Sequence, residues 1–588
     1  MTDTPQQSTG QASELASPQV ATLSPQAKRT LEILGVILIL IAAMVPRMRD
    51  FGEGFDREFD GAQGASFAIF AVNYERLGVG THLGYPVHDV DLVEDMEANA
   101  KDITLYANHP PAVSLTIWLA AKLMGPAGWN EAWKADRAPE GLAPVMRMPF
   151  LLAHLGSLVL LYLVVRSVSN QRRAMIALAV MAAIPVSIIY ATIVNYENPV
   201  LLFVLAAAFF HVRFLQRGKR ADLIGFGLCA LFGCATTFFH VFYLPGLTIQ
   251  AFLRNKRRAI QLAVSAIIGL LVPLVAHAVM SARSLANIDQ SPSRLSNRIN
   301  SMLEPLFDGS IPITQWASYQ WERSMRYFSE PILIIAVIGV ALALISRKSP
   351  QSSTGSESQS SESNRPIELT IPLLSGGLLL MFVMYRHTAD GWNGGDGQVP
   401  FLMYLTPGVA LAASLFFDKL STPLAKLRGG IAPLVIAVSL VCVPGLERAN
   451  ELRRPIRAPG PRDDPALTTG PAMPLPSVMG REIAPVIPAG EFAICPLALG
   501  LTPAALYYSW RTIIPVDPEF PATTRLALAK IAARGKDAWL LLPREQNGAI
   551  RTTSDQLFAI VKAAVPAADR DQPDYSNEHW MSWRLPSK

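Results

Sequence analysis

Acidic side chains gather in one polar segment of the chain, residues 47–110. This segment holds twelve Asp and Glu residues against five Lys and Arg residues, a net charge of −7. Asp56, Glu58 and Asp60 stand directly before a helix-like run, residues 65–77. A carboxylate beside a substrate can accept or donate a proton, whereas one that precedes a helix can simply cap it and gain from the helix dipole. The cluster is therefore a candidate for chemistry, and the alternative is that Asp60 caps the helix while the other acids are solvated.

A second polar motif, Asn108-His109-Pro110-Pro111, stands immediately before an apolar run, residues 112–124. The two prolines restrict the backbone at this point because each fixes its own φ. They are expected to hold Asn108 and His109 where the chain enters apolar surroundings. His109 could bind an anionic group there, or it could serve only as an interfacial residue.

The elements between which these motifs lie are predicted to be membrane spans. Only 16% of the 588 residues are charged and 51% are hydrophobic, whereas soluble domains have about 25% charged residues. Apolar runs recur along the chain, each near the length that crosses about 30 Å of hydrocarbon. The first covers residues 33–45, and the others centre near Val159, Ala182, Leu205, Leu231, Leu247, Leu270, Ile335, Leu378, Val409 and Ile436. This pattern predicts an all-α polytopic membrane protein.

Basic residues predict the orientation of the spans, because cytoplasmic loops carry an excess of Lys and Arg. If every basic cluster is cytoplasmic, the N-terminus is inside, the acidic segment is outside and the C-terminal region ends outside. The run at residues 112–124 is short, and a full crossing there would invert every later cluster. It is re-entrant, interfacial or part of a pair of spans. We expect an odd number of spans, about eleven to thirteen for runs of this length.

The chain divides into segments of different character. Residues 1–29 are a polar tail that is expected to be disordered in the cytoplasm. Residues 30–446 form the transmembrane domain, with its first outside loop at residues 47–110. The Ser-rich stretch at residues 349–366 is expected to be a flexible cytoplasmic linker within that domain.

Residues 447–588 begin with a proline-rich connection and continue as a mixed segment. Strand-like runs at residues 492–495 and 539–542 flank a helical pattern at residues 524–533. This order predicts a small α/β domain outside the membrane.

Together, the acidic segment and the His-Pro-Pro motif resemble the large membrane glycosyltransferases of the GT-C fold, which include protein O-mannosyltransferases and lipid A aminoarabinose transferases. In that family an apolar-Asp-Glu motif follows the first span, and a His-Pro-Pro or Lys-Pro-Pro element opens the next membrane segment. Phe59-Asp60 resembles the first motif, and His109 with its two prolines resembles the second. Further similar segments are Arg147 with Pro149, Pro185, Asn195–Pro199, His387, Pro400–Pro407 and Tyr507–Pro515.

The chain departs from the family at two places. Gly61 stands where the family usually has Glu, so a paired carboxylate would be Glu58 or Asp56. Asn198 stands where the family often has Asp, with Glu197 beside it. The identity of the catalytic base is therefore open among several carboxylates.

The resemblance implies transfer of a sugar from a polyprenyl phosphate to an acceptor hydroxyl or phosphate. Such a reaction needs a base for the acceptor, which we assign to Asp60 with Glu58 and Asp56 as alternates. It also needs cations that stabilise the departing phosphate. The candidate phosphate-binding residues are His109, Arg386 and His387, and the secondary site candidates are Glu197 and Asn198.

The implied partners are a sugar donor linked to polyprenyl phosphate and a lipid, protein or polysaccharide acceptor at the plasma (inner) membrane. The residues require no metal or cofactor, although a divalent metal is compatible with them. Asp89-Val90-Asp91 resembles the metal-binding element of nucleotide-sugar transferases, but such a triplet arises easily by chance in an acid-rich loop. No Gly-rich phosphate loop stands in a strand–helix context, and a net charge of +5 gives no argument for nucleic acid.

Two other functions stay open at this point. A transporter or lipid flippase would place ionisable residues inside its spans, whereas the acids here gather in one outside loop. A non-catalytic subunit of the same fold would tolerate the departures at Gly61 and Asn198. Replacing Asp60 by Asn distinguishes these possibilities, since only a transferase should lose its activity.

Overall fold

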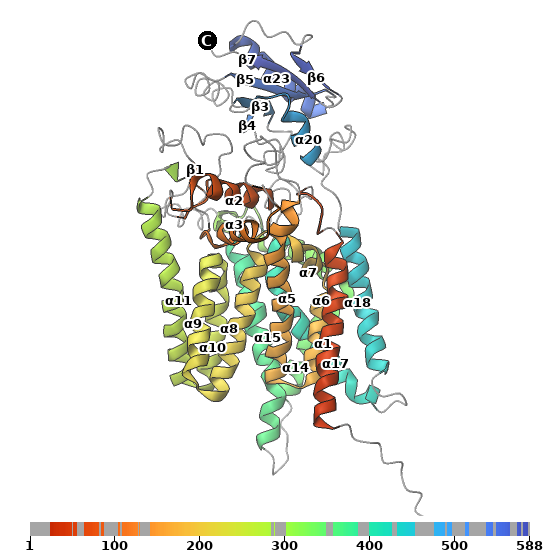
Figure 1. The fold of residues 1–588 in the computed structure, drawn as a ribbon. Coiled ribbons are helices and arrows are strands. Elements are labelled where there is room, and N and C mark those ends of the chain that lie inside the picture. Colours follow the sequence, from red (N-terminus) through yellow and green to blue (C-terminus); the bar gives the residue numbers. More distant parts are fainter. Residues whose placement is uncertain are drawn as a thin grey trace, which may run out of the picture.

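The computed structural model shows a helical bundle with a small mixed sheet beyond one of its ends (Figure 1). The structure describes residues 24–49, 51–55, 64–80, 84–87, 104–105, 109–126, 129, 141–283, 287–288, 302–348, 357–385, 388, 399–425, 432–452, 476–488, 491–496, 512–516, 537–544, 548–564, 573–577 and 580–585. Outside these described residues lie Asp56, Glu58, Asp60, Asp89, Asp91, Arg386, His387 and the helical pattern at residues 524–533.

The bundle is built from long helices that run side by side (Figure 1). They are α1 (Pro25–Met48), α5 (Leu142–Val168), α6 (Gln171–Ala183), α8 (Glu197–Arg217), α9 (Arg220–Thr236), α10 (Leu244–Arg254), α11 (Lys256–Arg283), α14 (Glu330–Lys348), α15 (Glu357–Val383), α17 (Thr406–Ala425) and α18 (Ala432–Leu452). Their inward faces share one apolar core, yet outward apolar side chains such as Leu38 and Leu253 are also exposed. A helix that is apolar on all sides suits a lipid environment. The predicted polytopic membrane fold is confirmed.

Six helices of the described chain are long and apolar enough to cross a membrane, and the number rises to eight if each of two bent pairs is one span. One pair joins α6 to the segment Pro185–Thr192 with a bend of 68°, and the other joins α13 (Ile313–Phe328) to α14 with a bend of 113°. Helices α9 and α10, with 17 and 11 residues, are shorter than these spans. The expected total of eleven to thirteen spans depends on such short helices and stays a prediction.

Short helices close the end of the bundle beyond which the sheet lies, here named the domain end (Figure 1). Helices α2 (Ala65–Leu77) and α3 (Ala112–Met124) run across this end rather than along the bundle. The 13 residues of α3 extend about 20 Å, which is too short to cross a membrane. Of the three alternatives that the sequence leaves open for this run, a helix lying across the end of the bundle is the one observed.

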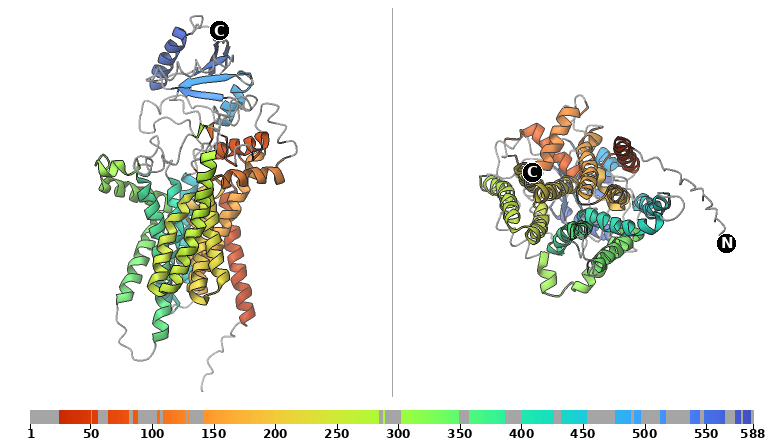
Figure 2. Two further views of the ribbon diagram at one scale, coloured as in Figure 1. Left: turned by 90° about the vertical axis from the view of Figure 1, so that its left-hand side faces the viewer. Right: turned by 90° about the horizontal axis from the view of Figure 1, so that it is seen from below.

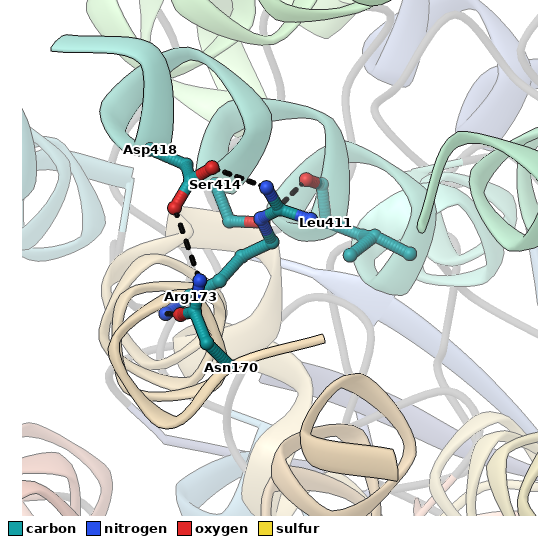
Figure 3. Close-up of polar contacts among 5 residues, drawn as sticks. All are labelled: Asn170, Arg173, Leu411, Ser414 and Asp418. Atoms are coloured by element: carbon teal, nitrogen blue, oxygen red, sulfur yellow. Dashed lines mark hydrogen bonds and ion pairs between the residues drawn. The ribbon is translucent and has the colours of Figure 1, made fainter. Parts of the chain in front are cut away.

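The opposite end of the bundle, where α1 begins, is here named the tail end, and ion pairs join neighbouring helices there. Arg173 of α6 pairs with Asp418 of α17, and the Asn170 amide donates to the same carboxylate at 3.4 Å (Figure 3). Asn170 also caps α6 by accepting the backbone N–H of Arg173 at 2.9 Å. Arg254 of α10 pairs with Glu368 of α15. These pairs use basic residues from the connections that the sequence places in the cytoplasm.

The Arg173–Asp418 pair leads to a prediction about stability. The two side chains are only 11% and 22% exposed, so Asp418→Asn leaves a largely buried guanidinium without its counter-charge. We expect the variant to lose about 2 kcal/mol of stability, measured as a lower midpoint of thermal unfolding in detergent. Glu451→Gln is the control, because its pair with Arg448 is exposed by 59% and 40% and should contribute less than about 0.5 kcal/mol. Equal midpoints for the two variants would contradict the prediction.

Helix α15 begins at Glu357, inside the stretch at residues 349–366 that the sequence suggests as a flexible linker. The second part of that stretch is helical and continues into the apolar part of α15, which starts at Pro366. A helix can continue beyond its apolar part, because helical backbone hydrogen bonds are local. The other expected domain boundaries stay predictions.

The C-terminal domain contains a five-stranded sheet in the order β4-β3-β5-β7-β6. Its elements are α20 (Pro476–Ile483), β3 (Phe492–Pro496), β4 (Thr512–Val516), β5 (Ala538–Pro543), α23 (Gly548–Ala564), β6 (Tyr575–Ser576) and β7 (Trp580–Leu585). β3 is parallel to β4 and β5, whereas β7 is antiparallel to β5 and β6. Ile494 and Leu540 pack on the face that α23 covers, and Trp539 packs on the other face. The strands expected at residues 492–495 and 539–542 are confirmed as β3 and β5.

Candidate active site

Aromatic rings from four segments meet at the domain end. The segments are the residues before α3, those before α8, η4 (Phe238–Tyr243) and η6 (Val399–Leu405). The His109 ring centroid lies 4.4 Å from that of Tyr196 and 5.5 Å from that of Phe239. Phe239 in turn lies 5.6 Å from Phe401 and 6.1 Å from Tyr404. These five residues are named the aromatic cluster, and they bring the His-Pro-Pro motif into contact with segments far along the chain.

His109 has a defined orientation within this cluster. Its Nδ1 lies 3.0 Å from Oγ1 of Thr237, the residue that caps η4. The side chain is only half-buried. The contact therefore fixes the ring at the start of α3 while leaving part of it accessible to an anionic group.

Glu197 is the buried acid of the site. It is the first residue of α8 and is 2% exposed. Within the described part of the chain, its Oε2 and the hydroxyl of Tyr404 have no hydrogen-bond partner. Glu197 follows Tyr196, whose ring contacts Phe239, and the Phe239 ring in turn contacts that of Tyr404. A buried polar group without a partner costs free energy, so two of them in one place indicate a site that a polar ligand completes.

The next residue, Asn198, belongs to a different network. Its Oδ1 lies 3.1 Å from Nδ1 of His154, and its amide donates to the carbonyl of Tyr190 at 2.6 Å. Oγ of Ser187 lies 3.4 Å from the other ring nitrogen of His154 and accepts a hydrogen bond from Arg47 at 3.2 Å. This chain of contacts joins α1, α5, α7 (Pro185–Ile189) and α8. Asn198 therefore joins helices through its hydrogen bonds, whereas Oε2 of Glu197 has no partner among the described residues.

Arg147 of α5 holds the chain directly before the candidate acids Asp56, Glu58 and Asp60. Its guanidinium donates to the carbonyls of Phe51 at 3.0 Å and Gly54 at 2.8 Å, and also to that of Glu53. It lies 5.2 Å from the ring centroid of Phe55. Arg147 is 2% exposed and Phe55 is fully buried. The next residue in the sequence, Asp56, is the first of the three candidate acids. Arg147 therefore holds the residues that lead to these acids.

The chain that follows the three candidate acids is also packed against the bundle. Helix α2 begins at Ala65 and packs with α3 and α5 in a second apolar core that includes Phe55. Tyr196 packs against this core and so joins it to the aromatic cluster. Tyr74 of α2 donates to the carbonyl of Gly84 at 2.5 Å, and burial raises the pKa of its phenol, which keeps the donor protonated. Phe55 and Ala65, which flank the three candidate acids in the sequence, therefore share one apolar core that adjoins the aromatic cluster.

The structure thus treats the predicted site residues differently. His109 belongs to the aromatic cluster and Glu197 follows its member Tyr196 in the sequence. The other candidates, Asp56, Glu58, Asp60, Arg386 and His387, lie outside the described residues. In the described ranges, no three His, Cys, Asp or Glu side chains come together as metal ligands. The contacts of Arg147 and the participation of Tyr404 were not expected. The signal for the first is an arginine at the start of an apolar run, a position that often marks function in membrane helices.

Comparison with known proteins connects this geometry to an activity. Residues 140–281 match the family model described as dolichyl-phosphate-mannose-protein mannosyltransferase. The fold is similar to that of the Archaeoglobus fulgidus oligosaccharyltransferase, with a TM-score of 0.54, 11% identity and coverage of 88% of this chain and 69% of that chain. It is also similar to ArnT from Cupriavidus metallidurans bound to undecaprenyl phosphate, with a TM-score of 0.51, 11% identity and coverage of 95% and 98%. No curated protein matches the chain by sequence.

These similarities confirm the GT-C fold that the motifs suggest. The family segment covers α5 to α11, which include Arg147, Glu197 and Phe239. The family segment and the shared fold together indicate a glycosyltransferase.

Proposed function

We propose that this GT-C glycosyltransferase takes a sugar from a polyprenyl phosphate and transfers it to an acceptor hydroxyl or phosphate at the domain end of the bundle. The observation that carries the proposal is the Oε2 atom of Glu197, which lies beside the aromatic cluster and has no partner among the described residues, in the region where Arg147 holds the chain before Asp56. ArnT from Cupriavidus metallidurans, which has a similar fold, is bound to undecaprenyl phosphate in its structure. The family match names an enzyme that uses dolichyl-phosphate-mannose. Both similarities support a polyprenyl-phosphate donor.

In the proposed reaction, the acceptor oxygen bonds to the anomeric carbon of the sugar while the bond from that carbon to the phosphate oxygen breaks. The phosphate leaves with the electron pair of the broken bond. A carboxylate takes the proton of the acceptor. We assign this base to Asp60, with Glu58 and Asp56 as alternates.

His109, Arg386 and His387 are proposed to bind the departing phosphate, because cations stabilise the charge that it carries away. Glu197 is proposed to accept hydrogen bonds from sugar hydroxyls, which would give its Oε2 the partner that it lacks among the described residues. The rings of the aromatic cluster offer an apolar surface for the C–H groups of the sugar.

We place the domain end outside the plasma (inner) membrane. Basic residues near 166–173, 217–220 and 254–258 lie in connections at the tail end, and such connections are usually cytoplasmic. The N-terminus is then cytoplasmic, and the acidic segment and the C-terminal domain are outside. A lipid, a protein or a polysaccharide on that side can provide the acceptor group.

A transfer assay with the purified protein in lipid nanodiscs tests the proposal, with a membrane extract as the source of acceptor. We expect sugar transfer from a polyprenyl-phosphate sugar and none from the matching nucleotide sugar. Glu197→Gln keeps the size of the side chain and replaces one carboxyl oxygen by an NH2 group. It should lower kcat/KM by about 10-fold to 100-fold, because leaving a buried hydrogen-bonding group without its partner costs about 1–3 kcal/mol.

Glu368→Gln is the matched control, since Glu368 lies at the tail end in a partly exposed pair with Arg254. Its kcat/KM should stay near that of the wild type. Transfer from the nucleotide sugar would contradict the donor assignment. Equal kcat/KM values for the two glutamine variants would contradict the role of Glu197.

A further inference from the structure

Two neighbouring connections at the tail end of the bundle are strongly basic. One joins α8 to α9 and the other joins α10 to α11 (Figure 1), and the tail end faces the viewer in Figure 2, right. Five bases of these connections have exposed side chains and are named the cationic patch: Arg217, Lys219, Arg220, Lys256 and Arg257. In the part of the chain that the structure describes, none of the five forms an ion pair.

The two connections are held together by Arg258 of α11. Its half-buried guanidinium donates to the carbonyl of Leu215 in the last turn of α8. Gly218 ends α8 with a φ of 67°, and a Cβ at this position would lie only 2.9 Å from Nη2 of Arg258. The backbone N–H of Arg258 donates to Oδ1 of Asn255 at 3.0 Å, which caps the start of α11. The bases of the patch therefore lie on one rigid surface rather than on two independent loops.

Two acids lie on helices next to the patch, and each is already paired with another base. Asp222 in the first turn of α9 pairs with Arg213 at 2.8 Å and is 3% exposed. Glu368 of α15 pairs with Arg254 of α10. The described residues therefore leave the five charges of the patch without a counter-charge. Bases gathered in this way repel one another and attract an anion.

Exposed apolar side chains adjoin the patch on the same helices. Phe252 and Leu253 of α10 are 51% and 81% exposed. Ile224 of α9 and Ile260 of α11 are each 61% exposed. The ammonium group of Lys256 lies 5.6 Å from the ring centroid of Phe252, so charge and apolar surface meet directly. A soluble anion would contact only the charges, whereas a molecule with an anionic head and hydrocarbon chains would contact both surfaces.

We propose that the cationic patch binds the phosphate headgroup of an acidic phospholipid in the membrane leaflet at the tail end. The acyl chains of this lipid lie along the exposed apolar faces of α9, α10 and α11. Basic pockets between membrane helices suit such headgroups. The start of α9 adds to the attraction, because it has no side-chain cap and helix N-termini favour anions. The aromatic cluster lies at the opposite end of the bundle, so this inference does not depend on the proposed sugar transfer.

Binding of phosphatidylglycerol to the full chain in detergent tests this inference, with phosphatidylcholine as the neutral reference. Lys219→Gln combined with Arg257→Gln should weaken phosphatidylglycerol binding about 25-fold, because each base beside an acidic headgroup contributes about fivefold in affinity. Arg172→Gln combined with Lys419→Gln is the matched control. It removes the same charge from two exposed bases of α6 and α17, also at the tail end, and should bind as the wild type does. All four replaced side chains are exposed, so both double variants should unfold at the wild-type midpoint.

The outcomes distinguish a lipid site from two simpler explanations. An equal loss of binding in the two double variants would mean that only the total positive charge of the tail end matters, which overturns the patch. Displacement of phosphatidylglycerol by an equal concentration of inorganic phosphate would overturn the lipid as the occupant. Equal affinity of the wild type for the two phospholipids would overturn the proposal as a whole. A loss confined to the Lys219 and Arg257 variant, with a preference for phosphatidylglycerol that weakens as salt screens the exposed charges, supports it.

Discussion

Asp60→Asn should reduce kcat for sugar transfer by about 10³-fold, because asparagine has nearly the size of aspartate but cannot take the proton of the acceptor. Donor binding and thermal stability should stay near those of the wild type. The reason is that both ends of the stretch that contains Asp60 are held, since Arg147 binds the chain up to Gly54 and α2 begins at Ala65. An isosteric change inside this stretch removes none of those contacts. The measurement is kcat with the polyprenyl-phosphate sugar at saturating concentration.

Other acids of the same segment provide the comparison. Asp95→Asn changes an acid that has no proposed role and should keep the wild-type rate. A fully active Asp60→Asn beside an inactive Glu58→Gln or Asp56→Asn would move the base to that residue. Full rates in all three variants would exclude a base in this cluster. A transporter or a non-catalytic subunit would be indifferent to every one of these changes.

Local patterns predict the elements whose form depends on near neighbours. Short apolar runs place β3 and β5 at the expected residues 492–495 and 539–542, because a strand that is buried on both faces is apolar at every position. The apolar run at residues 112–124 shows the limit of such patterns. Its length excludes a full crossing, but only its packing against α2 and α5 in the folded chain decides where it lies.

The candidate site depends on contacts that no local pattern contains. Arg47 donates to the carbonyl of Ala182, 135 residues away in the sequence, and Arg147 donates to that of Phe51, 96 residues away. An arginine in an apolar run signals a specific role, yet the run does not identify its partners. The sequence also does not distinguish Glu197 from Asn198. Only the tertiary contacts show that Oε2 of Glu197 has no partner among the described residues, whereas Oδ1 of Asn198 contacts His154.

The second large effect is expected at Arg147. Lysine keeps the positive charge but lacks the planar fork with which the guanidinium reaches the carbonyls of Phe51, Glu53 and Gly54 together. The chain directly before Asp56 should then shift. A displacement of about 1 Å in a catalytic group can reduce the rate about 100-fold, so Arg147→Lys should lower kcat by about that factor. The KM for the donor should change less, because the cations proposed to bind the phosphate are elsewhere in the chain.

Arg47→Lys is the matched control for this variant. Arg47 is also a buried arginine, and it donates to the carbonyls of Ala43 and Ala182 at 2.8 Å and 3.1 Å. Both lysine variants should lower the midpoint of thermal unfolding, because each leaves buried carbonyls with fewer donors. Only Arg147→Lys should also lower transfer per folded molecule by about 100-fold. Equal activity of the two variants would show that Arg147 only stabilises the fold.

A double-mutant cycle then tests whether Arg147 acts through Asp60. Groups that act as a unit lose their effects together rather than in sum. If Arg147 works by positioning Asp60, adding Arg147→Lys to Asp60→Asn should reduce kcat by less than about threefold beyond the single Asp60→Asn variant. A full further loss of about 100-fold would mean that Arg147 acts on the reaction independently of Asp60. The cycle therefore measures how far the effect of Arg147 on kcat depends on the carboxylate of Asp60.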